Sequence, residues 1–408
     1  MTRVLLDVSP IGSRPEARTG LARVALDLAS SLADLPDVSL ATCAWGSVEA
    51  SRQFRAVRAE FPRLAGLETT PGLCERLFLA ASSRISPGSL LSRTLLRRAG
   101  QVLNVCRDPL RGHDLRQFDV VHSTYARIPR VVRRRARRCI MTVHDLIPLK
   151  VPPRVMPRHL VGINTRIMRS IQPSDWVVCV SEHTRRDFLA YIKHPVDRTV
   201  VIPNGVDHRL FHPVTDAGDL GVMRARFGLG DRPFVLTLSS LAPHKNLAML
   251  AAIWPEVRRR CPDGILVVAG GAAAQRDEVE RLFRARDDAG VRVTGFVPDE
   301  GFRSLASACQ AFLFPSLYEG FGLPILEAMA CGAPVICSDA AAIPEVVGDT
   351  AAMVDPHDTA AWTARVADAL TAPVRNLPHE GSIRRAGLFS WNRCAQEHAA
   401  LYRRVAAE

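Results

Sequence analysis

The chain has 408 residues, of which 47% are hydrophobic and 23% charged, with 53 Lys and Arg against 41 Asp and Glu. This balance excludes a disordered chain, a collagen and a small disulfide scaffold, and the length allows two domains with separate cores. No apolar run approaches the roughly 20 residues that span a bilayer, and the opening MTRVLLDVSP is typical of a first strand rather than a signal peptide. We therefore expect a cytoplasmic protein.

The N-terminal half of the chain is strongly cationic. Residues 1–200 carry 32 Lys and Arg against 17 Asp and Glu, a net charge of +15, whereas the remaining residues carry 21 against 24, a net charge of −3. The densest stretch, RIPRVVRRRARRC at 127–139, holds seven arginines. Each basic residue near an anionic surface contributes about 1 kcal/mol of attraction, which predicts a polyanionic partner. Any single arginine is explained as well by a solvated helix face.

Nucleic acid and an anionic membrane are the two polyanions to weigh. A single-strand binder would interleave aromatic residues with its cations, and only Tyr125 lies near the arginines between Arg130 and Arg138. We therefore expect an anionic membrane surface as a partner and no nucleic acid.

Apolar runs and helical periods alternate along the first half of the chain. Residues 3–8, 119–123, 139–144 and 175–181 are apolar enough for strands of a parallel sheet that is covered on both faces. A helical period follows the first run, and Ser181 is a plausible N-cap for another helix. Residues 50–117 are less regular, and we expect helices there.

A second alternating series begins after a break rich in Pro, Asn and Gly at 201–213. Strands are expected at 234–239, 265–270, 291–295, 311–316 and 334–338. Two such series predict an α/β fold with two doubly wound, Rossmann-like domains and a ligand cleft at the carboxyl ends of their strands. The expected division is 1–200, 201–385, and a C-terminal helix at 386–408 that could cross back to the N-terminal domain.

The segment FPSLYEGFGLPILEAMACGAPVICSD at 314–339 carries the clearest chemical signal. A strand ends at Ser316, a glycine-containing turn follows, and a helix is expected from Pro324 to Cys331. Such a unit directs free backbone N–H groups and the positive end of the helix dipole to one spot. The natural occupant is a phosphate or a diphosphate.

Three charged residues could complete this site. Glu319 lies in the turn and Glu327 on the helix, so they are better placed to accept hydrogen bonds from two ends of an extended ligand than to act as one acid pair. The simpler alternative makes both ordinary surface residues. Lys245 is one of only three lysines among the 53 basic residues, which suggests a site that needs a compact ammonium.

Metal and thiol chemistry find little support in the residue pattern. The ten cysteines are scattered without a CxxC pair or zinc-ligand spacing, so we expect buried, reduced thiols. There is also no DxD triplet to hold a diphosphate through a divalent cation. We expect no bound metal and no cofactor.

The E-x7-E pattern of Glu319 and Glu327 resembles the signature of retaining glycosyltransferases of family 4, which have the GT-B fold. Further segments resemble that family in the expected order, namely the loop from Gly12 to Gly20, TVHDLIP at 142–148, VIPNGVD at 201–207 and LSSLAPHKNL at 238–247. The resemblance covers most of residues 140–370 and is thinner between 45 and 115. It implies a hexosyltransferase with two Rossmann-like domains.

The resemblance also implies roles for individual residues. Lys245 would contact the diphosphate of the donor, Glu319 would face the sugar hydroxyls near the anomeric carbon, and His144 would lie beside the transferred sugar or the acceptor. These three are the expected catalytic residues.

The remaining donor-binding roles follow in the same way. Glu327 would bind the ribose hydroxyls, Phe296 and Val297 would flank the base, and the backbone of Gly12 would approach the phosphate. Many relatives have Arg where this chain has Ser240, so more of the leaving-group charge should fall on Lys245. The turn would supply its backbone through Gly320, Phe321, Gly322 and Leu323.

The resemblance predicts transfer of a hexose from a nucleotide-diphosphate sugar, with GDP-mannose favoured, to a saccharide or polyprenyl-diphosphate-linked acceptor. Such a reaction belongs to lipopolysaccharide, capsule or other cell-surface polysaccharide assembly at the inner face of the plasma membrane. The alternatives are a GT-B-like hydrolase, epimerase or phosphorylase, and a non-catalytic binder of anionic lipid or nucleic acid.

Overall fold

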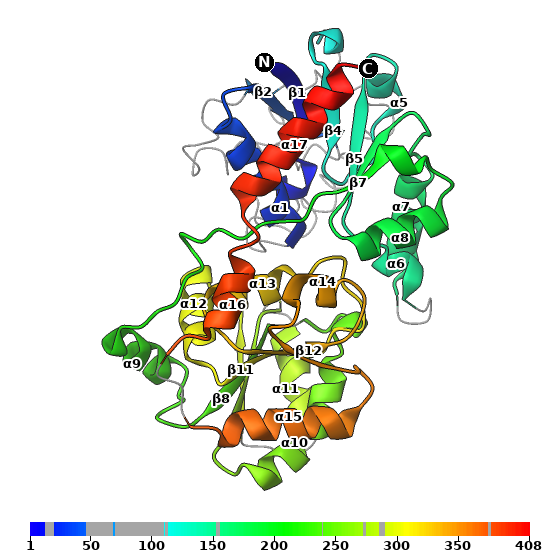
Figure 1. Ribbon diagram of the computed structural model, residues 1–408. Coiled ribbons are helices and arrows are strands. Elements are labelled where there is room, and N and C mark those ends of the chain that lie inside the picture. Colours follow the sequence, from blue (N-terminus) through cyan, green and yellow to red (C-terminus); the bar gives the residue numbers. More distant parts are fainter. Residues whose placement is uncertain are drawn as a thin grey trace, which may run out of the picture.

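The computed structural model describes residues 1–12, 20–45, 68–69, 110, 113–151, 156–238, 240–271, 275–284, 290–373 and 377–408. Within these residues the chain forms two α/β lobes, one above the other in Figure 1. Most of the predicted segment 50–117, the loop 13–19, Cys74 and Cys106 lie outside the described residues.

The N-terminal lobe is built on a parallel sheet of seven described strands in the order β3-β2-β1-β4-β5-β6-β7. All four strands expected here are present, whereas β2, β3 and β7 were not predicted. The strands are β1 (Thr2–Asp7), β2 (Val38–Cys43), β3 (Glu68–Thr69), β4 (Val120–Ser123), β5 (Cys139–Val143), β6 (Trp176–Cys179) and β7 (Thr199–Val201).

Helices cover both faces of this sheet, as its uninterrupted apolar strands require. Leu6 and Val178 face a core shared with α1 and the C-terminal helix α17, whereas Leu5 and Val177 face a core that includes Phe188 of α8. The helices of this lobe are α1 (Gly20–Ala33), α5 (Arg130–Arg133), α6 (Ile147–Lys150), α7 (Arg158–Met168), α8 (Glu182–Tyr191) and α17 (Trp391–Ala406).

The C-terminal lobe repeats the architecture with six described strands in the order β10-β9-β8-β11-β12-β13, all parallel. Every strand predicted in this half is present, and β13 is the addition. The strands are β8 (Phe234–Leu238), β9 (Ile265–Ala269), β10 (Val291–Gly295), β11 (Ala311–Phe314), β12 (Val335–Ser338) and β13 (Ala352–Val354).

Two separate apolar cores hold the helices of this lobe to the two faces of its sheet. The helices are α9 (Ala217–Arg226), α10 (Leu247–Arg260), α11 (Arg276–Arg284), α12 (Asp299–Ala308), α13 (Leu323–Ala330), α14 (Ile343–Val347), α15 (Thr359–Thr371) and α16 (Glu380–Ala386). The two lobes thus have the two-domain α/β architecture of the GT-B fold.

The chain crosses between the lobes twice, and the crossings lie side by side. Val206 in the first crossing pairs with Ser390 in the second through an isolated β-bridge. A side chain at Gly205 would lie 2.2 Å from the Ser390 carbonyl carbon, so only glycine allows this approach. After the second crossing, α17 packs against α1 and β1 of the N-terminal lobe (Figure 1).

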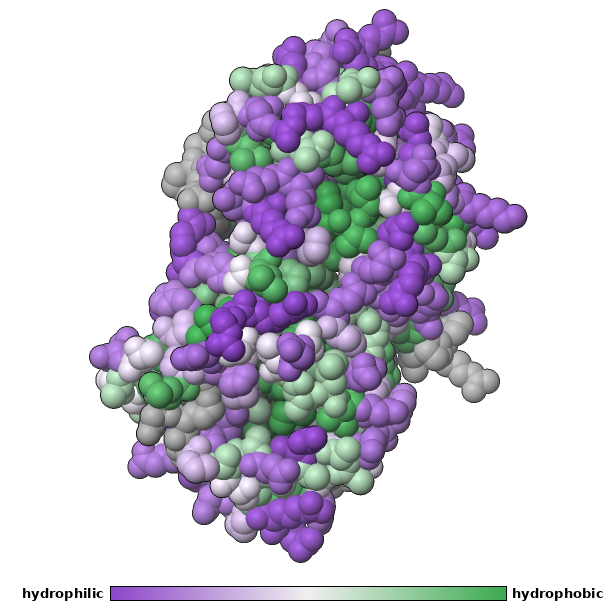
Figure 2. All heavy atoms as spheres, viewed as in Figure 1, coloured by the Kyte–Doolittle hydropathy of each residue, from purple (hydrophilic) through white to green (hydrophobic). Residues whose placement is uncertain are grey.

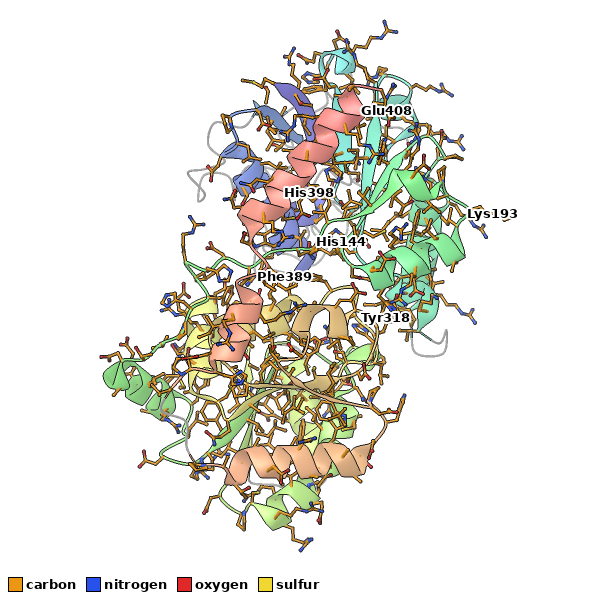
Figure 3. All side chains as sticks on the ribbon, viewed as in Figure 1. His144, Lys193, Tyr318, Phe389, His398 and Glu408 are labelled. Carbon is orange, nitrogen blue, oxygen red and sulfur yellow. The ribbon has the colours of Figure 1, made fainter. Side chains whose placement is uncertain are left out.

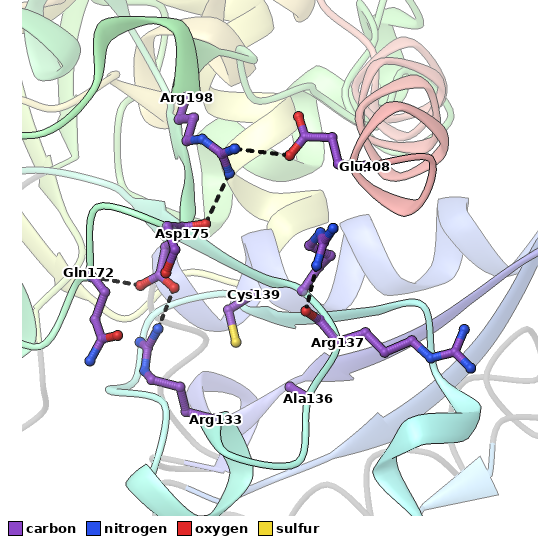
Figure 4. Close-up of a pocket in the computed structure, with 10 residues that line it drawn as sticks. Arg133, Ala136, Arg137, Cys139, Gln172, Asp175, Arg198 and Glu408 are labelled. Atoms are coloured by element: carbon purple, nitrogen blue, oxygen red, sulfur yellow. Dashed lines mark hydrogen bonds and ion pairs between the residues drawn. The ribbon is translucent and has the colours of Figure 1, made fainter.

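The arginine-rich segment lies at the amino ends of β5 and β6, the opposite edge of the sheet from their carboxyl ends. It borders a cavity of about 610 Å³ in which Arg133 pairs with Asp175 and Arg198 pairs with Glu408 at 3.2 Å (Figure 4). The arginine-rich segment is therefore separated from the carboxyl ends of β5 and β6 by the length of these strands. Figure 2 shows hydrophilic side chains over much of the face in view, interrupted by small hydrophobic areas.

In the described part of the chain, no helix combines the length and the apolar character that a membrane crossing needs. All eight cysteines there are buried, and none forms a disulfide.

Candidate functional site

The site forms where the carboxyl ends of the two sheets face each other. On the C-terminal side, β11 ends at Phe314 and the turn that follows enters α13 through Gly322, whose φ of 107° is a left-handed conformation that glycine tolerates. A side chain at Gly320 would lie 1.8 Å from the carbonyl oxygen of His144. This turn therefore packs directly against the backbone of the HDLIP segment.

Lys245, at the end of the 3-10 helix Pro243–Lys245 after β8, forms an ion pair with Glu319 of this turn. The Lys245 ammonium donates to Oε1 of Glu319 at 2.7 Å, and it lies 5.3 Å from the centre of the Phe314 ring. Glu319 is 7% exposed, and the Lys245 side chain is 22% exposed. An ammonium has three N–H donors, so two remain for a ligand in the cleft.

The first turn of α13 presents unused backbone donors next to this pair. Pro324 occupies the first turn, where its missing N–H costs nothing. Among the described residues, the N–H groups of Gly322 and Leu323 have no hydrogen-bond acceptor. The helix dipole adds positive potential at the same place, which suits an anionic ligand.

His144 lies on the N-terminal side of the cleft, just after β5, and Figure 3 shows it between the two lobes. Its Nε2 donates to the carbonyl oxygen of Thr124 at 2.7 Å, so the proton of the neutral ring is on Nε2. Burial lowers the pKa of His144 to about 4. At neutral pH its Nδ1 is therefore an acceptor, and it has no hydrogen-bond partner among the described residues.

Residues that the sequence did not single out hold the turn against the N-terminal lobe. Ser181 and Thr184 at the start of α8 both donate to the carbonyl oxygen of Gly320, at 2.7 and 3.1 Å. The Tyr318 hydroxyl donates to Asp187, which also accepts from Lys150 at 2.6 Å. The N-cap prediction at Ser181 was a signal for α8, but nothing in the spacing indicated its second partner.

Glu327 is buried rather than on the surface, with 6% exposed. Its Oε1 accepts from Arg23 of α1 at 2.5 Å, and the same guanidinium also binds Asp299 at the start of α12. Burial raises the pKa of Glu327 to about 7, and the positive charge of Arg23 acts against this shift. Arg23 lies 304 positions away from Glu327 in the chain, and no sequence signal indicated it.

Four further residues were predicted to bind the donor, namely Gly12, Ser240, Phe296 and Val297. Gly12 ends a short 3-10 turn after β1, and the Ser240 hydroxyl accepts from the Ala242 N–H at 3.4 Å. Phe296 is 61% exposed, whereas Val297 belongs to the core of the C-terminal lobe, so any contact of Val297 with a base would involve mainly its backbone.

Two buried aspartates complete the N-terminal side. Burial raises the pKa of Asp7, at the end of β1, to about 7, although its carboxylate accepts hydrogen bonds from Ser9 and Trp45. Asp145 accepts from the Ile147 N–H at 2.9 Å and thereby begins the short helix α6, and burial raises its pKa to about 6. This contact with the backbone gives Asp145 a structural role.

Comparison with known families gives two matches that together span both lobes. A family model described as Glycosyltransferase Family 4 matches residues 18–210. A second, described as Glycosyl transferases group 1, matches residues 232–372. The interval between the two matches, 211–231, follows the first crossing and includes α9.

Individual relatives point the same way. The O-antigen chain mannosyltransferase B of Escherichia coli is 30% identical over 276 residues, which are 66% of this chain and 71% of that protein. A GDP-mannose-dependent alpha-(1-6)-phosphatidylinositol monomannoside mannosyltransferase of Mycolicibacterium smegmatis is 35% identical, over 56% of this chain and 61% of that protein. The structure of Anabaena HepE in complex with UDP-glucose superposes with a TM-score of 0.66 at 18% identity, covering 98% of this chain and 99% of the other.

Proposed function

Because the chain belongs to family 4 of the glycosyltransferases, we propose that it transfers mannose from GDP-mannose to a lipid-linked or polysaccharide acceptor, with retention at the anomeric carbon. As a member of that family it is a hexosyltransferase whose donor is a nucleotide sugar. The sugar, the base and the stereochemical course are the proposed parts.

The observation that carries the proposal is the arrangement of Lys245, Glu319 and the first turn of α13 next to one another at the edge of the cleft. When the bond between the sugar and the diphosphate breaks, negative charge develops on the leaving oxygen. The two remaining Lys245 donors and the free N–H groups of Gly322 and Leu323 are suited to stabilise that charge without moving. Glu319 fixes the direction of the ammonium.

Retention follows if the departing phosphate oxygen accepts the proton of the acceptor hydroxyl on the same face of the sugar. Such a path needs no protein base at the acceptor oxygen. His144, neutral and with a free Nδ1, would then orient a sugar hydroxyl by accepting its hydrogen bond rather than by carrying a proton.

The names of two relatives support mannose, and one of them supports GDP-mannose as the donor. Glucose is the competing sugar, because HepE was solved with UDP-glucose and shares the fold. The same relatives act on O-antigen and phosphatidylinositol mannoside acceptors by name, which favours cell-surface glycan assembly at the cytoplasmic face of the membrane.

The experiment is a donor panel read in two ways. GDP-mannose, GDP-glucose, UDP-glucose and UDP-N-acetylglucosamine are compared by thermal stabilisation of the protein, since a ligand at a hundredfold excess over its Kd adds about 2.7 kcal/mol. Products are then identified with and without an acceptor extract. GDP-mannose should stabilise most and yield a mannosylated, configuration-retained product. Stabilisation by UDP-glucose alone would replace the donor, and free sugar as the sole product would indicate a hydrolase.

Membrane attachment needs a separate test, because the arginine-rich edge does not face the cleft. We expect binding to vesicles with anionic lipid at low salt, weakened when Arg137 and Arg138 are replaced by Ala, with donor turnover in solution unchanged. These two arginines line the cavity at that edge and lie outside the cleft. Equal binding to neutral vesicles would remove the membrane from the proposal.

A further inference from the structure

Arg23 connects the two lobes at the place where the nucleoside of a donor is expected. It lies in the first turn of α1 in the N-terminal lobe, yet its guanidinium reaches Glu327 on α13 and Asp299 on α12 in the C-terminal lobe. The guanidinium also lies 5.2 Å from the centre of the Phe211 ring. With only 17% of its side chain exposed, Arg23 is part of the closed interface.

The acidic residues around Arg23 are stabilised by its positive charge. Burial raises the pKa of Asp27, one turn further along α1, to about 7, and Arg23 lowers it while Asp207, Glu327 and Asp299 raise it. The carboxyl groups of Glu327, Asp299 and Asp27 thus all lie close enough to raise the pKa of the Arg23 guanidinium. Because an uncompensated charge in such a place is strongly destabilising, separation of the lobes or loss of Arg23 changes the state of Glu327.

The guanidinium uses only one oxygen of Glu327. NH1 binds Oε1, NH2 is directed to Asp299, and among the described residues Oε2 of Glu327 has no hydrogen-bond donor. The planar fork fixes the carboxylate plane, and a single ammonium could not span both carboxylates in the same way. One acceptor oxygen is left in a defined direction for a ligand hydroxyl.

We propose that Arg23 is a positioning residue of the N-terminal lobe that holds Glu327 for the ribose hydroxyls of the donor and thereby couples nucleotide binding to closure of the two lobes. This inference rests on the proposed function, because it assumes a nucleoside diphosphate in the cleft. The nucleotide site is then complete only when α1 and α13 are together.

A different interlobe ion pair provides a matched control. Arg186 of α8 approaches Glu345 of α14 at 3.9 Å, with side chains that are 68% and 34% exposed. Exposed pairs of this kind contribute little to stability. Arg186→Ala therefore removes an interlobe arginine without touching Glu327.

The experiment compares Arg23→Ala, Arg23→Lys and Arg186→Ala. The dissociation constants of GDP and UDP are measured by calorimetry. Steady-state kinetics with the donor identified above give kcat and KM. X-ray scattering with and without nucleotide gives the radius of gyration. For Arg23→Ala we expect Kd and donor KM to rise about tenfold or more, kcat to change much less, and a larger radius that nucleotide no longer reduces fully. Arg23→Lys should be intermediate, and Arg186→Ala should match the wild type.

Two further variants keep the test decisive. In a Glu327→Gln background, Arg23→Ala should add little to the rise in Kd, because both changes disrupt the same contact. If Arg23→Ala does not fold, Asp299→Asn releases one arm of the guanidinium and should raise Kd by a smaller factor. If the Arg23 variants bind nucleotide with the Kd of the wild type, this inference is overturned. If the wild-type protein itself binds no nucleotide, the proposed function is overturned.

Discussion

The turn on the C-terminal side of the cleft and the residues on its N-terminal side differ in their charge. The turn presents an ion pair, Lys245 with Glu319, beside a helix dipole, although burial raises the pKa of Glu327, further along α13, to about 7. The N-terminal side has titratable groups that burial shifts toward their neutral forms: the pKa of Asp7 is raised to about 7, that of Asp145 to about 6, and that of His144 lowered to about 4. Among the described residues of this lobe, the arginine-rich segment that contributes to the net charge of +15 lies away from the cleft.

This difference indicates that the two sides of the cleft would bind different parts of the substrate. The side that would receive a diphosphate keeps its charges and exposes some of them, because a fixed cation near a developing anion lowers the barrier to its formation. In the proposed complex, the opposite side would offer hydrogen bonds to sugar hydroxyls. Arg23 of the N-terminal lobe is charged, and it reaches across to Glu327.

The largest effect is expected from removing the cation of the charged side. Lys245→Ala takes away the ammonium and leaves Glu319 buried without its partner. We expect kcat to fall about 10²-fold or more, as for other removed donors at a developing oxyanion, with a smaller change in donor KM. Steady-state kinetics measure both quantities.

A matched lysine controls for the loss of positive charge. Lys193 is exposed at the right-hand side of the N-terminal lobe in Figure 3, and Lys193→Ala should leave kcat and KM unchanged. If Lys245→Ala retained more than a tenth of the wild-type kcat, the charged side would not be the part of the cleft that stabilises the leaving group.

A smaller loss of activity is expected when a methyl group added at Gly320 moves the two sides of the cleft apart. In Gly320→Ala, the new Cβ would meet the His144 carbonyl oxygen at 1.8 Å, so the turn must shift away from the N-terminal lobe. Displacement of a catalytic turn by about 1 Å can cost up to 10²-fold in rate, and we expect a tenfold to hundredfold fall in kcat. A Cβ at Gly221 of α9 would have no other atom within 4 Å, so Gly221→Ala should keep full activity. Equal activity in the two variants would show that the close approach is dispensable.

The sequence predicted the parts of the site that are local in the chain. The strand, the glycine turn and α13 follow each other within one segment, and Glu319 and Glu327 belong to it. The two alternating series likewise predicted the two sheets, because each strand of a covered parallel sheet is apolar by itself. The strands β7 and β13 were missed because they are short, and β2 because polar residues interrupt its apolar run. The two-residue strand β3 lies in the segment 50–117, where helices were expected.

Contacts between the lobes could not be predicted in this way. The partners Arg23 and Glu327, and likewise Ser181 and Gly320, come from distant segments whose approach depends on how two complete domains pack. The burial of Glu327 is a consequence of the same packing. Similarly, composition indicated that the N-terminal half is basic, but only the topology of β5 and β6 locates its arginine-rich segment at the edge away from the cleft.

The smallest expected effect is on the stability of the protein, and it concerns Asp7 on the N-terminal side of the cleft. The pKa of Asp7 is raised from 3.8 to about 7 by burial, so the folded state binds more protons than the unfolded state between these values. Asp7 therefore contributes a free energy of unfolding that decreases as pH rises through this window, by about 1 kcal/mol per pH unit, and is constant above it. An asparagine could keep the bonds from Ser9 and Trp45 while losing the titration.

We expect the stability of Asp7→Asn relative to the wild type to increase from pH 5 to pH 7 and then to level off. Urea denaturation at half-unit intervals of pH measures this difference, and the buried histidines, which act with the opposite sign, cancel because both proteins contain them. A flat profile for Asp7→Asn would mean that Asp7 is ionised in the folded protein, and the contrast between the two sides of the cleft would then be one of partners and not of charge.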